Sequence, residues 1–298
     1  MNFKTTISGI GDPFIVKHKE LYYLYATSYS NGFYVWVSKD LKTFSKPQVC
    51  YEKNERSFGY KDFWAPEVIY DGQKFIMHYT ARAKTSDSLR IGVAISDSPL
   101  GPFVDVYDQT PMFDYGYAAI DGHVFVDSDD IKYFYFSKDC SENWIDGIKT
   151  SEIFVARLSD DYLKIIGKPQ KILTPDKDYE RIGFDDGDKY LWNEGAYMVK
   201  KDDTYYLMYS ANYFADKNYC ICAAKSKYPD RAFEKFEKPI LTYQDIDESG
   251  PGHHMMLKQD SGYLCVYHVH TDKYKPSGDR TMCHIPVRIK NNEFIFDK

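Results

Sequence analysis

The stretch Gly11-Asp12-Pro13-Phe14-Ile15-Val16 sets a polar head residue on a short apolar run, and the aromatic run Leu21-Tyr22-Tyr23-Leu24-Tyr25 follows after a turn. The same order of polar head, apolar run, turn and aromatic run returns four more times along the chain. Each copy predicts two adjacent antiparallel strands, because short runs rich in aromatic and β-branched residues and bounded by turns are typical of hairpins. The head residues of the five copies are, in order, Asp12, Glu67, Asp121, Glu194 and His253.

The spacing of the head residues predicts the fold. Successive heads lie roughly 54 to 73 residues apart, a little longer than the 40 to 50 residues that are usual for propeller blades. A third strand and a turn rich in Ser, Asp and Pro complete each copy, as in Ser96-Asp97-Ser98-Pro99. The prediction is an all-β protein, a five-bladed β-propeller with four-stranded antiparallel blades around a central channel, in one domain over residues 1–298. We expect the N-terminal segment near Phe3 to Ile7 to supply the missing outer strand of the fifth blade.

The composition agrees with a β protein and limits the partners. Of 298 residues 43% are hydrophobic, and the 28 Tyr and 19 Phe favour strands over helices. The formal net charge is −6, without a basic stripe. Nucleic acid and anionic membranes are therefore poor partners, and a neutral substrate is a better one.

The termini and the cysteines suggest a location. The sequence has no run of 18 apolar residues, and Met1-Asn2-Phe3-Lys4 has no apolar signal core behind it. We therefore expect a cytoplasmic protein. The six cysteines are scattered without the spacing of zinc ligands, which predicts reduced thiols in the core.

The head residues are candidates for catalysis because the innermost strands of propeller blades converge on one axis. Asp12, Asp121 and Glu194 each enter an apolar strand beside Gly or Pro. One acid in such a place is usually a turn residue, but three at similar positions in five repeats favour a site. Glycoside hydrolysis needs such a group, with one protonated carboxyl for the leaving oxygen and one ionised carboxylate for water.

Five short motifs in order give the chain a family resemblance. It resembles glycoside hydrolase family 43, the five-bladed propeller enzymes that release arabinose or xylose from plant polysaccharides. The resemblance covers nearly all of the chain. Its motifs are Gly11-Asp12-Pro13, Trp64-Ala65-Pro66-Glu67, Ile120-Asp121-Gly122, Asn193-Glu194-Gly195 and Gly250-Pro251-Gly252-His253.

The resemblance implies a role for five residues. Asp12 is expected to be the general base, Glu194 the general acid, and Asp121 the third acid that orients Glu194 and raises its pKa. Arg280 is expected to bind substrate hydroxyls. His253 is expected beneath the sugar, where many family members hold a calcium ion on the axis. Chemistry is expected to need no cofactor, so calcium would be structural.

Four further residues have open roles. Glu67 shares the phase of the acids in the repeat and is interpreted as a polar residue of the channel or substrate shell. Trp64, Phe33 and Trp144 are candidates for substrate contact by stacking on a sugar face, and core packing is the alternative for each. The stretches 51–62, 138–150 and 179–190 are interpreted as insertions between second and third strands that rim one mouth of the ring.

The sequence leaves several functions open. The first is an exo-acting, inverting α-L-arabinofuranosidase that acts on small arabinose- or xylose-containing oligosaccharides. A β-xylosidase is the nearest competitor, and we favour arabinose because the sequence has no added β-sandwich domain. An arabinanase would need an open groove. A sugar-binding propeller without catalysis would have no reason to keep all three acids.

Overall fold

A computed structural model describes residues 2–182, 184–185 and 189–297. Almost all regular structure in this part of the chain is β-strand, as the aromatic composition predicts. The helical elements described are three single turns. None of the described helices has the length and apolar character needed to cross a membrane. The helical turns are η1 (Cys140–Glu142), η2 (Asp178–Glu180) and α1 (Tyr243–Ile246).

Four four-stranded antiparallel sheets begin with a strand that carries one of the first four head residues. The first is β2 (Gly11–His18), β3 (Leu21–Thr27), β4 (Gly32–Ser38) and β5 (Gln48–Glu52). The second is β6 (Gly59–Tyr70), β7 (Phe75–Ala83), β8 (Leu89–Ser96) and β9 (Val104–Asp105). The third is β10 (Ala119–Val126), β11 (Lys132–Lys138), β14 (Glu152–Leu158) and β15 (Ile165–Leu173). The fourth is β18 (Asn193–Lys201), β19 (Thr204–Ala211), β20 (Cys220–Ser226) and β21 (Glu234–Lys235).

The last of these antiparallel sheets joins the two ends of the chain. Its strands are β22 (Gly252–Gln259), β23 (Gly262–His270), β24 (Arg280–Lys290), β25 (Glu293–Phe296) and β1 (Phe3–Ser8). Strand β1 pairs with β24, with Phe3 opposite His284, and β25 also pairs with β24. The prediction that an N-terminal strand completes the last unit is confirmed.

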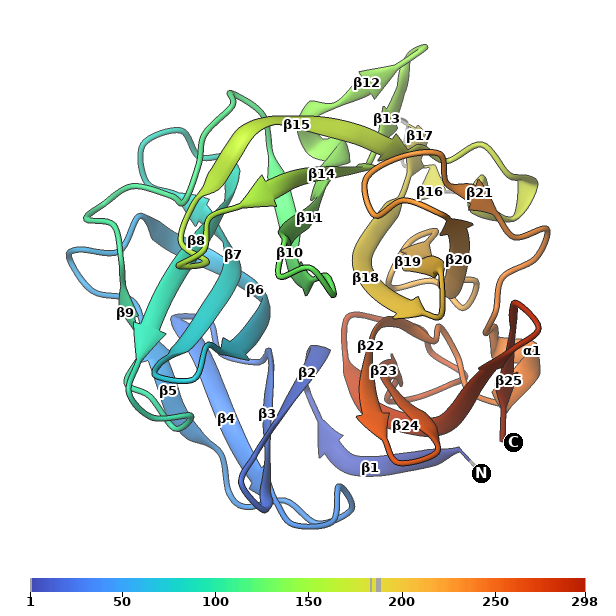
Figure 1. Cartoon of the computed structure of the whole chain (residues 1–298), viewed down its shortest axis with the longest axis horizontal. Helices are drawn as coiled ribbons and strands as arrows, with labels where there is room; N and C mark the ends of the chain where they lie inside the picture. Colours follow the sequence, from blue (N-terminus) through green and yellow to red (C-terminus); the bar gives the residue numbers. More distant parts are fainter. Residues whose placement is uncertain (1, 183, 186–188, 298) are drawn as a thin grey trace.

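The first strands of the five sheets lie around a common centre (Figure 1). They contact one another in the cyclic order β2, β6, β10, β18, β22 and back to β2. Large aromatic side chains of these sheets are fully buried, among them Tyr25, Tyr79, Tyr135 and Tyr209. All six cysteines are buried and unpaired, as predicted.

Every first strand has a bulge at the same place. In β2, the register of the pairing with β3 shifts around Asp12. One residue of each bulge has a positive φ. Equivalent shifts occur in β6, β10, β18 and β22. The extra residue of such a bulge bends the strand and re-aims a side chain. The positive-φ residues are Asp12, Ala65, Asp121, Gly195 and His253.

This register corrects the predicted phase of the repeat. Ala65, not Glu67, is the structural equivalent of Asp12, and Glu67 lies two residues further along its strand. Glu194 lies one residue before the bulge position, where Gly11 stands in β2. Sequence spacing alone could not separate these positions because the offset is only one or two residues.

The bulges also connect neighbouring sheets. The Ala65 N–H donates to Thr27 Oγ1 of the preceding sheet at 2.8 Å. The Asp121 N–H donates to Thr80 Oγ1 at 3.1 Å, and the His253 N–H donates to Ser210 Oγ at 2.8 Å. The Asp12 N–H donates to His268 Nδ1 of the last sheet at 3.1 Å. These bonds join four of the five pairs of neighbouring sheets at the bulges.

A small mixed sheet stands apart from the five larger ones (Figure 1). Three stretches were predicted to be insertions between a second and a third strand, and this is correct for 138–150. It is wrong for 51–62 and 179–190, which connect successive sheets. The strands of the small sheet come from 138–150 and 179–191. They are β12 (Trp144–Ile145), β13 (Ile148–Thr150), β17 (Lys189–Leu191) and β16 (Phe184–Asp185).

Candidate active site

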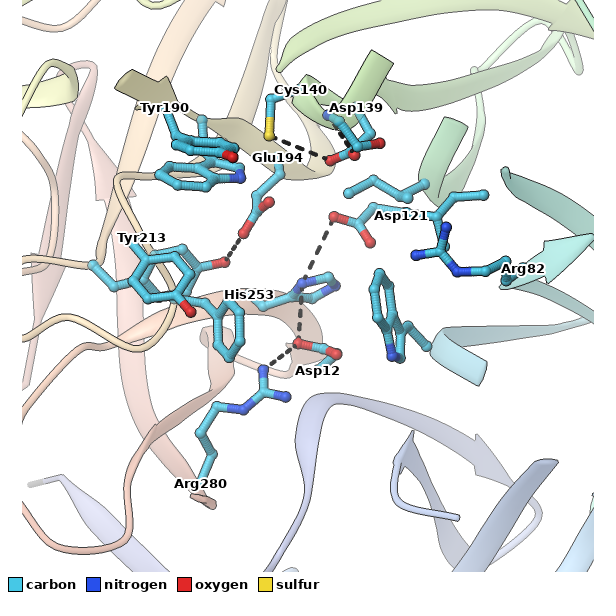
Figure 2. A pocket seen from close by; sticks show the side chains of 17 residues that line it. Asp12, Arg82, Asp121, Asp139, Cys140, Tyr190, Glu194, Tyr213, His253 and Arg280 are labelled. Atoms are coloured by element: carbon cyan, nitrogen blue, oxygen red, sulfur yellow. Dashed lines mark hydrogen bonds and ion pairs between the residues drawn. The ribbon is translucent and has the colours of Figure 1, made fainter. Parts of the chain in front are cut away.

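A pocket of about 330 Å³ opens where the first strands of the five larger sheets meet, and 17 residues line it (Figure 2). Its size falls in the range of small-molecule sites, roughly 300 to 1,000 Å³. The lining includes three carboxyls that the sequence singled out, from three different sheets. The ionisable side chains of the lining include Asp12, Arg82, Asp121, Asp139, Glu194, His253 and Arg280.

Asp12 is surrounded by hydrogen-bond donors and positive charge. Its Oδ1 accepts from Arg280 Nη1 at 2.9 Å, and its Oδ2 accepts from Thr27 Oγ1 at 2.5 Å. The ring atom His253 Nδ1 lies 3.3 Å from Oδ1. Burial by itself would raise the pKa of Asp12, but the charge of Arg280, then His253 and His268, outweighs it and holds the pKa well below its usual range. Asp12 is therefore ionised at neutral pH.

The close approach of Arg280 requires a glycine. A Cβ on Gly11 would lie 2.1 Å from the Arg280 guanidinium carbon, so no other residue fits there without moving the arginine. Arg280 is the first residue of β24 and reaches Asp12 from the last sheet. The Gly11-Asp12 pair thus supplies both the carboxylate and the space for its cation.

His253 lies between two of the acids. Its Nδ1 is 3.3 Å from Asp12 Oδ1 and 4.0 Å from Asp121 Oδ2, so one imidazole faces both carboxyls (Figure 2). Asp121 Oδ2 also accepts the N–H of Gly195 at 3.0 Å. Burial raises the pKa of Asp121 to about 8, although the positive charge of His253 acts in the opposite direction. Through its hydrogen bond to the Gly195 N–H, Asp121 also supports the backbone directly after Glu194.

Glu194 lies in a less cationic part of the pocket. Its Oε1 accepts from the hydroxyl of Tyr219 at 2.8 Å. Burial raises the pKa of Glu194 to about 8; the Tyr219 hydrogen bond lowers it, and the negative charge of Asp139 raises it. The carboxyl is therefore mostly protonated at neutral pH, as a general acid must be.

Tyr219 is held on two sides. Its ring stacks on His268 with centroids 5.6 Å apart and planes 6° apart. A Cβ on Gly252 would lie 2.0 Å from the Tyr219 ring, so this glycine provides the space for the tyrosine. Because His268 accepts the Asp12 N–H, the packing that holds Glu194 is continuous with the packing that holds Asp12.

A buried ion pair supports the residue before the general-acid candidate. Glu180 is fully buried, and its Oε2 accepts from Lys235 Nζ at 2.7 Å. Asn193 donates to Glu180 Oε1 at 3.3 Å and accepts from Lys235 at 3.2 Å. Removing Lys235 would leave the Glu180 carboxylate buried without its cation, which is strongly destabilising. This cluster therefore fixes the start of β18 and with it the position of Glu194.

The structure brings together some predicted substrate residues and not others. Trp64 lines the pocket, whereas Phe33 does not. Phe33 is fully buried between the first two sheets, where its ring packs against Tyr51 and Tyr79. Its prediction as a substrate residue is corrected, because its strand position turns it into the core. Trp144 lies outside the pocket lining on the small sheet, with 53% of its surface exposed.

Sequence reasoning missed several pocket residues. Asp139 and Tyr219 come from segments without a head motif, and a fold is needed to bring them to Glu194. Asp139 lies directly after β11, where it also caps η1 by accepting the Ser141 N–H at 2.9 Å. Glu67 does not line the pocket; its Oε2 lies 2.9 Å from His123 Nδ1.

The calcium prediction finds limited support in the donors present. The described residues contain no group of three or more His, Cys, Asp or Glu side chains placed to hold a metal ion. Calcium takes six to eight oxygen ligands, so an ion near His253 would need ligands other than these side chains. Calcium at this site remains a prediction.

The site therefore combines an ionised carboxylate, Asp12, with two carboxyls of raised pKa, Asp121 and Glu194, in one small pocket. Glycosidases use an ionised carboxylate to activate water and a protonated carboxyl to protonate the leaving oxygen. The class that the fold and the site define is a glycoside hydrolase. The chain belongs to this class by sequence as well: it is a member of glycosyl hydrolases family 43, whose model matches residues 6–295.

The names of individual relatives differ in substrate. A solved structure described as a thermostable family-43 glycoside hydrolase is 40% identical, with a TM-score of 0.91, covering 99% of this chain and 95% of that one. The β-D-galactofuranosidase xynD of Aspergillus niger is 27% identical and covers 83% of this chain and 69% of that protein. The xylosidase/arabinosidase 43A of Humicola insolens is 33% identical and covers 50% of this chain and 51% of that protein. The chain thus spans about half to two thirds of the length of these curated relatives.

Proposed function

We propose that the protein is a five-bladed propeller glycosidase, an exo-acting α-L-arabinofuranosidase that hydrolyses arabinose-containing oligosaccharides with inversion. The observation that carries this proposal is the contrast between Asp12, kept ionised by Arg280, and Glu194, kept protonated by burial and Asp139, in one pocket. The cyclic contacts of the five head strands support the propeller. The small volume of the pocket favours a terminal sugar over the middle of a polymer.

In this proposal Asp12 and Glu194 share one reaction. Asp12 takes a proton from the water that attacks the anomeric carbon, and Glu194 gives a proton to the leaving oxygen. Inversion requires the two carboxyls to be roughly 6.5 to 9.5 Å apart, so that the water fits between them. Asp12 and Glu194 come from strands of different sheets and lie on either side of His253 (Figure 2).

Arg280 has two partners in this reaction. Without substrate it pairs with Asp12, and the family resemblance assigns it to substrate hydroxyls. When a sugar hydroxyl takes part of its hydrogen bonding, the pKa of Asp12 rises toward its ordinary value. Substrate binding therefore makes Asp12 a better base at the moment when a base is needed.

A β-xylosidase is the second candidate, because the relative from Humicola insolens carries both activities in its name. One assay decides between the candidates: 4-nitrophenyl α-L-arabinofuranoside and 4-nitrophenyl β-D-xylopyranoside, measured side by side. Higher kcat/KM on the arabinofuranoside supports the proposal, and higher kcat/KM on the xylopyranoside replaces it with the second candidate. Proton NMR of the first-formed sugar tests inversion. Binding without turnover of either compound or of the matching oligosaccharides would instead indicate a sugar-binding protein.

A further inference from the structure

The small sheet carries a row of side chains that leads out of the pocket. Trp144 pairs with Lys149 across β12 and β13, and Lys149 pairs with Tyr190 across β13 and β17. Directly opposite residues on neighbouring strands project from the same face of a sheet. These three side chains therefore lie side by side over two strand spacings, about 10 Å.

The contacts between these side chains make the row continuous. The ammonium group of Lys149 lies 5.0 Å from the centre of the Trp144 ring system and 4.7 Å from the centre of the Tyr190 ring. Lys149 Nζ also donates to the Tyr190 hydroxyl at 2.9 Å. Tyr190 in turn stacks on Trp192, with ring centroids 5.7 Å apart and planes 11° apart. The row ends inside the pocket, because Tyr190 and Trp192 both line it.

The row approaches the pocket from the side of the leaving group. Trp192 and Tyr190 precede Glu194 by two and four positions, and Figure 2 shows Tyr190 next to Glu194 and far from Arg82. A general acid lies beside the oxygen that departs with the leaving group. A leaving sugar held beside Glu194 would therefore border this wall of the pocket.

The chemistry of the row suits a neutral sugar chain. Trp144 presents an exposed indole on the rim, and aromatic rings of this kind pack against the C–H faces of sugars. Beside it, the Lys149 ammonium group and the Tyr190 hydroxyl are polar groups of the kind that hydrogen-bond to sugar hydroxyls. A lone exposed tryptophan is unremarkable on a surface, but this one is connected to the catalytic pocket without a break.

From these observations we infer that the small sheet forms a leaving-group subsite, in which Tyr190 and Trp192 border the first sugar beyond the scissile bond and Trp144 stacks on the second. The substrate class is then an oligosaccharide with at least two sugars on the leaving side. This inference rests on the proposed glycosidase function, since it takes Glu194 as the general acid.

The test compares substrates of different length in Trp144→Ala. The probes are the 4-nitrophenyl glycoside that the wild type cleaves and the disaccharide and trisaccharide of the same sugar. We expect kcat/KM for the trisaccharide to fall about 3- to 10-fold, the range of one aromatic contact, and to fall more than kcat/KM for the disaccharide or the nitrophenyl glycoside. Lys149→Met, which keeps the aliphatic stem, should give a smaller loss in the same direction.

A matched control is available in the connection between β20 and β21. Tyr228 is 46% exposed and lies against Arg231, whose guanidinium is 4.1 Å from its ring centre. Tyr228→Ala removes a similar exposed aromatic and should leave the trisaccharide-to-nitrophenyl ratio unchanged. An unchanged ratio in Trp144→Ala would overturn the subsite.

A failure of the proposed function gives a different pattern. If the wild type cleaves no nitrophenyl glycoside and no oligosaccharide, the glycosidase assignment fails. Calorimetric titration of the arabinose and xylose trisaccharides into wild type and Trp144→Ala then tests the subsite alone. Weaker binding by the variant keeps the sugar subsite, and equal binding or none removes it.

Discussion

Asp12 and Glu194 are both buried carboxyls in one pocket, yet their surroundings favour opposite protonation states. Asp12 faces Arg280, His253 and His268, which outweigh the effect of burial on its pKa. Glu194 faces Tyr219 and Asp139, and burial dominates its pKa. The placement of charge, and not the depth of burial, therefore separates the pKa values of the two acids.

Removing either carboxyl should have the largest effect. We expect Asp12→Asn and Glu194→Gln each to reduce kcat by about 10²- to 10⁴-fold, the usual contribution of a positioned acid or base. Both substitutions keep the side-chain volume, so circular dichroism should show a folded protein. Near wild-type turnover in either variant would remove that residue from the reaction.

Removing the cation beside Asp12 should weaken the contrast from one side. In Arg280→Met the pKa of Asp12 rises, because the largest opposing charge is lost while burial remains. We expect the acidic limb of the kcat/KM profile to move to higher pH and kcat/KM to fall about 100-fold with lost hydroxyl contacts. An acidic limb that stays in place would show that Arg280 does not set the pKa of Asp12.

Two substitutions near Glu194 should move its titration in opposite directions. Tyr219→Phe removes a hydrogen bond that lowers the pKa of Glu194, so the alkaline limb of the profile should move to higher pH. Asp139→Asn removes a negative charge that raises the same pKa, so the limb should move to lower pH. We expect kcat to fall by about 10-fold or less in each. Shifts of the same sign in both variants would contradict this account.

The smallest effect on catalysis should come from Phe33, which the structure places in the core. Phe33→Ala should lower the free energy of unfolding by about 3 to 5 kcal/mol, as for other buried Phe residues. The kcat/KM per folded molecule should stay close to wild type, because Phe33 does not line the pocket. Urea unfolding and active-site titration provide the two measurements.

The sequence predicts those parts of the molecule that are encoded locally and repeated. The five head motifs recur, so the sheets, the N-terminal strand on the last sheet and the convergence of three acids could be inferred from spacing. Glu67 was assigned to the wrong position of the repeat, because the bulge in each first strand shifts the register by one or two residues. The spacing of the motifs does not reveal so small a shift. Tyr219 and Asp139 were missed because only the folded chain brings them to Glu194.

Aromatic residues outside the motifs were the hardest to interpret. Phe33 and Trp144 both lie near predicted loops, yet one is fully buried and the other is half exposed on a small sheet. An aromatic side chain suits a core and a sugar site equally well, so its residue type does not decide between them. The pairing of β13 with β17, between residues 41 positions apart, has no sequence signal of its own.

The most direct test of the central contrast is an NMR titration of the two side-chain carboxyl carbons, using ¹³C-labelled Asp and Glu and assigned with Asp12→Asn and Glu194→Gln. We expect the Asp12 signal to stay that of an ionised carboxylate from pH 4 upward, and the Glu194 signal to titrate near pH 8. A Glu194 signal that titrates near the ordinary pKa of 4.5 would contradict the contrast between the two carboxyls. So would an Asp12 signal that titrates above pH 4.5.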